Sequence, residues 1–152
     1  MLLQLLLFLH VMGTVIWVGG FAMHLSLMRL LRKEGPPEQR VKLMRYDDQL
    51  STTVHIPAGL TVLATGIVMV LKGGISWLEP WIIVGLVGWL IASLVGALFY
   101  VPNGKKLEEA IKAEGAGSAA ARRYVERAVL VTRLDFYLLV FVIFSMVTRL
   151  NF

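Results

Sequence analysis

Residues 1–31 read MLLQLLLFLHVMGTVIWVGGFAMHLSLMRLL, and almost every side chain in this run is apolar. An α-helix needs about 20 mostly apolar residues to cross the hydrocarbon core of a bilayer. We therefore predict a membrane-spanning helix over about residues 1–31.

Three more apolar runs follow along the chain, at about residues 50–71, 81–100 and 128–150. The chain is 57% hydrophobic and 16% charged, and its mean hydropathy is +0.73. This composition is too apolar for a soluble domain of 152 residues. We predict an all-α fold, an integral membrane four-helix bundle that forms a single domain over residues 1–152.

The segments between the apolar runs are polar. We expect a solvated loop with a short surface helix over residues 33–49, and helix caps at Ser51, Thr52 and Thr53. Residues 102–104 contain Pro and Gly and predict a break in the chain. Residues 105–127 predict two helical pieces, interrupted around Gly115 and Gly117.

Lysine and arginine are concentrated in the first and third connections, whereas the second has little besides Lys72. Cytoplasmic loops of membrane proteins carry an excess of these residues. We therefore expect both termini outside and both charged loops in the cytoplasm, in a bacterial cytoplasmic (inner) membrane. The net charge of +5 then indicates contact with the lipid bilayer and not with nucleic acid. The absence of cysteine excludes disulfides and thiolate metal sites.

One face of the first predicted helix carries His10, Gly13, Trp17, Gly20 and His24, because steps of three and four residues nearly complete a turn. The two histidines lie about 21 Å apart along the helix axis, so one haem or one metal ion does not reach both. Gly13, Trp17 and Gly20 predict a packing seam between them. His10 is expected to bond a neighbour, to ligate a cofactor or to pass a proton.

Four ionisable side chains fall at a similar depth near the charged end of their spans: His24, His55, Arg133 and Asp135. Such residues are costly inside a membrane and mark functional sites. We expect His24 and His55 to supply the axial imidazoles of a haem b, Arg133 to meet its propionates, and Asp135 to fix the tautomer of a ligating histidine. We expect a membrane protein that binds haem b in this way to act in electron transfer, porphyrin oxidation or haem handling, with a redox partner in the membrane.

Three alternatives remain open. In the first, His24 and His55 bond water near the headgroups while Arg133 pairs with Asp135. In the second, the protein handles copper, because Cu(I) prefers imidazole and thioether ligands. In that case the histidines supply the imidazole ligands, and the thioether ligands come from Met12, Met23, Met28, Met69 and Met146.

The third alternative is a scaffold without a cofactor. Gly88, Ala92 and Gly96 form a ridge of small residues that lets another helix approach closely, within the bundle or in a homodimer. Hydrolase chemistry is not predicted, since no serine or threonine has a matched base and acid.

Several segments carry a resemblance to known families: LHVMGTVIWVGG from Leu9, ATGIVMVLKGG from Ala64, PWIIVGL from Pro80, and the stretch from Tyr100 to Lys106. They resemble small bacterial predicted integral membrane proteins of the DUF2269 type. The first-helix pattern around His10 is also similar to HemJ-type protoporphyrinogen oxidases and, more loosely, to CopD-type copper membrane domains. The HemJ resemblance implies haem binding at His10, whereas His24 and His55 have no counterpart there. The CopD resemblance implies copper.

Overall fold

The computed structural model describes residues 1–34 and 36–149, except the side chains at positions 32–34, 37, 47 and 48. Its elements, which are all helical, follow in this order: α1 (Leu2–Glu34), α2 (Pro37–Leu50), η1 (Ser51–His55), α3 (Ile56–Gly73), α4 (Pro80–Val95), η2 (Gly96–Tyr100), α5 (Val101–Glu114) and α6 (Ala119–Thr148). The two η elements are π-helical segments.

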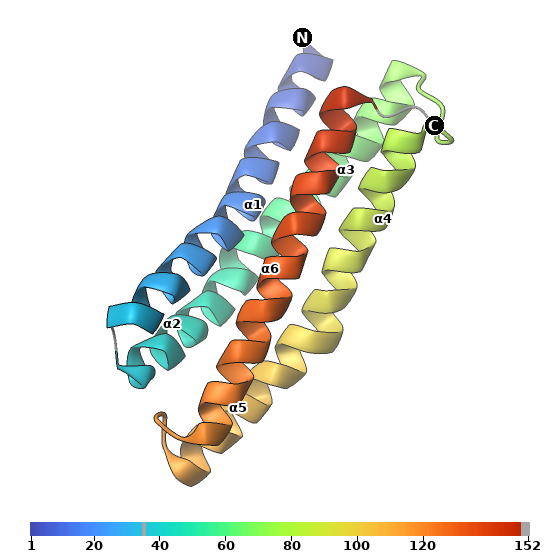
Figure 1. Ribbon diagram of the computed structural model, residues 1–152. Coiled ribbons are helices and arrows are strands. Elements are labelled where there is room, and N and C mark those ends of the chain that lie inside the picture. Colours follow the sequence, from blue (N-terminus) through green and yellow to red (C-terminus); the bar gives the residue numbers. More distant parts are fainter. Residues whose placement is uncertain (35, 150–152) are drawn as a thin grey trace.

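The described elements join into four long helices, since α2, η1 and α3 run on without a break and α4, η2 and α5 do the same (Figure 1). Each contains a stretch long and apolar enough to cross a membrane: Leu2–Leu31, Glu38–Gly73, Pro80–Glu114 and Ala119–Thr148. The predicted all-α membrane bundle is therefore confirmed. Figure 1 shows the N-terminus, the α3–α4 connection and the end of α6 at one end of the bundle, and α2 and α5 at the other.

The side of the membrane that each end faces stays a prediction. The end of the fourth predicted span, Leu150, lies outside the described residues.

The interruption expected around Gly115 and Gly117 is confirmed, because α5 ends at Glu114 and the hydroxyl of Ser118 caps α6 by accepting the N–H of Ala121 at 3.1 Å.

The two π segments account for helices that continue where the sequence predicts breaks. Each segment ends two residues before a proline, at His55 before Pro57 and at Tyr100 before Pro102. Proline lacks an N–H, and its ring collides with the carbonyl four residues earlier in an α-helix. A π turn contains one extra residue and relieves that collision by shifting the carbonyl.

Two predictions are corrected by this geometry. The surface helix expected within residues 33–49 exists, but it continues through η1 into α3, and residues 102–104 lie inside α5. Ser51, Thr52 and Thr53 cap no helix end, because they form η1, where the hydroxyls of Thr52 and Thr53 donate to the carbonyl of Gln49.

Helices α1 and α3 pack by placing large side chains of one helix against glycines of the other. A Cβ at these glycines would meet a side chain of the partner helix, in the pairs Gly13 with Val62, Gly20 with His55, Gly59 with Trp17 and Gly66 with His10. Because glycine lets two backbones approach closely, this exchange holds the histidines at the contact between α1 and α3.

The ridge of small residues on α4 packs against α6 of the same chain. Gly85 and Gly88 pack on Met146 and Val142 of α6, and Ala92 is buried as well. The homodimer predicted through Gly88, Ala92 and Gly96 is therefore not supported, since α6 already covers the first two positions.

Replacement of Gly88 by leucine tests this packing. We expect Gly88→Leu to lower the free energy of unfolding by about 1–3 kcal/mol or more, because the new side chain overlaps Val142. Gly96→Leu is the matched control, since a Cβ at Gly96 meets nothing within 4 Å. Thermal unfolding in detergent measures both variants, and equal losses would contradict the described α4–α6 contact.

Candidate functional site

His10 lies at the contact between α1 and α3 and bonds Thr65. Its Nδ1 is 3.1 Å from the Thr65 hydroxyl, and that hydroxyl donates its single hydrogen to the carbonyl of Thr61 at 2.6 Å. Thr65 must therefore accept the bond from Nδ1–H of His10. In the neutral imidazole this leaves the lone pair on Nε2.

His10 also lines a small, partly open cavity of about 50 Å³ between α1, α3, α4 and α6. Among the other lining residues are Trp17, Trp89 and Met146. The indole N–H of Trp89 donates to the carbonyl of Gly59 at 2.9 Å and so is not available to a ligand. The lining side chains that can donate an electron pair include His10, Met146 and Thr14, whose hydroxyl also donates to the carbonyl of His10 at 2.8 Å.

A second polar site is centred on Tyr100, the last residue of η2. Its hydroxyl lies 3.1 Å from Oδ2 of Asp135 and 3.1 Å from Oγ1 of Thr132, both on α6. Thr132 donates in turn to the carbonyl of Ala128 at 2.9 Å. Asp135 is 4% exposed, and its bond to Tyr100 supplies the partner that a buried carboxyl group requires.

His55, the last residue of η1, reaches the same level from α3. Its ring lies against Gly20 of α1 and 5.8 Å from the ring of Phe21. His24 follows Gly20 by four residues, hence on the same face and one turn further along. His24 is 3% exposed, so it lies inside the bundle.

The antiparallel register of α1 and α6 places His24 beside this site. His10 and Met146 line one cavity, and Met28 packs in one core cluster with Val125. Between these two contacts, this register brings His24 level with the turn of α6 over residues 129–132. We call His24, His55, Tyr100, Thr132 and Asp135 the inner polar layer.

Arg133 does not belong to this layer. It is exposed, whereas Asp135, two residues further along the same helix, is buried. Residues two positions apart in an α-helix point to different sides. The alternative in which Arg133 pairs with Asp135 is therefore not found, and Asp135 instead accepts a hydrogen bond from Tyr100.

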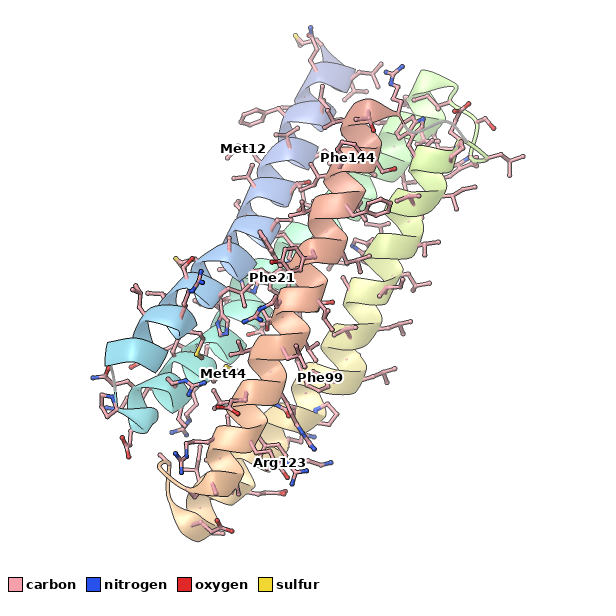
Figure 2. All side chains as sticks on the ribbon, viewed as in Figure 1. Met12, Phe21, Met44, Phe99, Arg123 and Phe144 are labelled. Atoms are coloured by element: carbon pink, nitrogen blue, oxygen red, sulfur yellow. The ribbon has the colours of Figure 1, made fainter. Side chains whose placement is uncertain are left out.

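The methionines of the predicted copper path differ in exposure, and Met69 is partly buried in α3. Met12 and Met23 are 40% and 57% exposed and face away from the bundle, as Figure 2 shows for Met12. Met28 lies in the core cluster and Met146 at the central cavity. Of Met28 and Met146, only Met146 shares a cavity with a histidine.

The sequence interpretation did not single out Thr65, Trp89 or Thr132. Their signals are weak, because a threonine or tryptophan in an apolar helix has many packing roles. One sequence pattern does mark two other residues of the site. At both His55 and Tyr100, a residue with a ring in its side chain stands two positions before a proline. Within the described residues, no three His, Asp or Glu side chains gather closely enough to hold a metal ion.

Comparison with protein families gives one finding. A family model described as "Predicted integral membrane protein (DUF2269)" matches residues 4–150. Neither the comparison with curated proteins nor that with solved structures finds a match.

Tyr100→Phe tests the inner polar layer. We expect it to lower the free energy of unfolding by about 1–3 kcal/mol, because Asp135 loses a hydrogen-bond donor while it remains buried. Tyr137→Phe is the control, since Tyr137 is 62% exposed and its change is expected within about 0.5 kcal/mol. Thermal unfolding in detergent compares the two, and equal stabilities would contradict the described bond.

Proposed function

The chain belongs to the DUF2269 family of predicted integral membrane proteins, and from that premise we propose that this multi-pass membrane protein handles copper and holds a Cu(I) ion in its central cavity. The observation that carries the proposal is the placement of His10 and Met146 at one small cavity. Thioether sulfur selects Cu(I), and imidazole suits copper as well.

The hydrogen bonds of His10 support a ligand role. A metal-binding histidine usually donates its second ring N–H to a fixed acceptor, which sets the tautomer and the ring orientation. Thr65 is such an acceptor, because its own hydrogen is directed to the Thr61 carbonyl. Nε2 of His10 is then the nitrogen that binds the ion.

The size and lining of the cavity fit an ion better than a larger group. A volume of about 50 Å³ admits a small ion or a water molecule. Trp17 and Trp89 contribute aromatic surface to the lining, and a cation is attracted to the face of an indole ring. A bound Cu(I) ion would be held by the His10 nitrogen and the Met146 sulfur.

The residues present do not fit a haem b between His24 and His55. Pockets for ligands of that kind measure about 300–1,000 Å³, and neither His24 nor His55 lines either of the two described cavities. At the level of the two histidines α1 and α3 touch, because His55 lies on Gly20. A hollow of about 640 Å³ is lined only by residues of α2 and η1, so it is the outer surface of one helix.

Replacement of Met146 tests the copper site. We expect reduced, detergent-purified protein to retain Cu(I) with a copper–sulfur signal in X-ray absorption, and Met146→Leu to lose that signal together with one bound ion. Leucine keeps the volume of methionine, so the fold is preserved. Met12→Leu is the control, because Met12 is exposed. A Met146→Leu protein with unchanged sulfur signal and copper content would contradict the proposal.

A visible spectrum tests the haem prediction on the same protein. After expression with ample haem we expect no Soret band, because the described bundle has no slot for the macrocycle. A Soret band that disappears in His24→Ala and His55→Ala would overturn the copper assignment in favour of haem, and it would show that α1 and α3 separate on binding.

A further inference from the structure

We infer that Asp135 is a proton-binding site within the bundle, and that the hydroxyls of Tyr100 and Thr132 reverse their hydrogen bonds when the proton binds or leaves. The ligand is a single proton exchanged with water. A carboxylate oxygen gains or loses one O–H bond, and no other reactant is needed. The inference does not rest on the copper proposal, because Asp135 does not line the central cavity.

The first observation is a chain of three oxygen contacts that links η2 to α6. Oδ2 of Asp135 lies 3.1 Å from the Tyr100 hydroxyl, and that hydroxyl lies 3.1 Å from Oγ1 of Thr132. Oγ1 of Thr132 in turn lies 2.9 Å from the carbonyl oxygen of Ala128. Each hydroxyl brings one hydrogen, whereas a carbonyl oxygen or an ionised carboxylate brings none. With an ionised Asp135, only two hydrogens are therefore present for three contacts.

The two protonation states of Asp135 differ in the direction of these bonds. When Asp135 is ionised, it accepts the Tyr100 hydrogen. The single Thr132 hydrogen is then directed to either Tyr100 or Ala128, and one contact has no hydrogen. When Asp135 is protonated, it donates to Tyr100, and Tyr100 donates to Thr132. The Thr132 hydrogen is then directed to the Ala128 carbonyl, so the protonated form makes all three contacts hydrogen bonds.

The second observation is the burial of the carboxyl group. Asp135 is 4% exposed and Thr132 is 2% exposed, in a helix long and apolar enough to cross a membrane. A charge is costly in such surroundings, and ionisable residues inside a span are a usual feature of proton relays. Arg133 is exposed and does not neutralise Asp135. A bound proton removes the buried charge and completes the chain of bonds.

The other titratable groups of the inner polar layer come from the helices packed around Asp135. Tyr100 belongs to η2, His24 is buried on α1, and His55 ends η1. An imidazole that held the proton in place of Asp135 would leave a carboxylate at the end of the chain. The contacts favour Asp135 as the proton carrier, because only a hydrogen on its oxygen supplies the third bond.

Infrared spectroscopy tests the site, because the carbonyl stretch of a protonated carboxyl group is separate from the bands of a carboxylate. At a pH of about 6, exposed aspartate and glutamate side chains are still almost fully ionised. We expect the full-length, detergent-purified wild type to show a protonated carboxyl band at this pH, and the band to be absent in Asp135→Asn. Glu126→Gln is the matched control that keeps the band, since Glu126 is exposed on the same helix.

A second measurement assigns the band without any substitution. The chain has three aspartates, Asp47, Asp48 and Asp135. Isotope labelling of the aspartate carboxyl carbon is expected to shift the band in the wild type. Asp135→Asn is suited to the comparison, because the amide has nearly the shape of the acid and its N–H donates to Tyr100 as the acid does.

Tyr100→Phe tests the chain of hydrogen bonds. The acid then loses the oxygen that accepts its hydrogen, so we expect the band of Asp135 to move to higher frequency. Tyr137→Phe is the control that leaves the frequency unchanged, because Tyr137 is 62% exposed.

Three outcomes would overturn the inference. They are a wild type without the band at that pH, a band that remains in Asp135→Asn, and a band that aspartate labelling does not shift. An unchanged frequency in Tyr100→Phe would overturn the reversal of bonds through Tyr100. These variants leave His10 and Met146 unaltered, so the copper content of the same preparations tests the proposed function separately.

Discussion

The arrangement of this bundle depends on how two prolines are accommodated within apolar helices. In a membrane every backbone N–H and carbonyl has to be satisfied by the protein itself, yet Pro57 and Pro102 lack the N–H and crowd the preceding turn. The π segments before them, Ser51–His55 and Gly96–Tyr100, keep the helices continuous. They also set the rotation of His55 and Tyr100, which brings both rings to the inner polar layer.

The contacts between the helices also depend on glycine. The rings of His10, Trp17 and His55 need space at the contact of α1 and α3, and each finds it over a glycine of the opposite helix. The same rule joins α4 and α6, where Gly85 and Gly88 receive Met146 and Val142. Close backbone approach is thus used for packing within one chain, and a small cavity lined by His10 and Met146 lies between the helices.

Much of the fold follows from the sequence because length and hydropathy are local properties. The apolar run of residues 1–31 and the polar stretch around Gly115 are recognised without knowing any neighbour. The break predicted at residues 102–104 was wrong because the effect of Pro102 depends on the turn before it. The alternative that pairs Arg133 with Asp135 is not found, because closeness in sequence says little about which side of a helix each residue occupies.

The sequence by itself determined that the chain is an all-α membrane bundle, since its four apolar runs have the length that a spanning helix needs and a helix satisfies its own backbone in lipid. It also determined which residue types are available for chemistry: three histidines, several methionines and no cysteine. Only the tertiary structure decided which of them meet. Helix rotation and register placed His10 with Thr65 and at one cavity with Met146, His55 against α1 beside His24, and Asp135 with Tyr100. These contacts join different helices, and depth along one helix does not fix its rotation against the next.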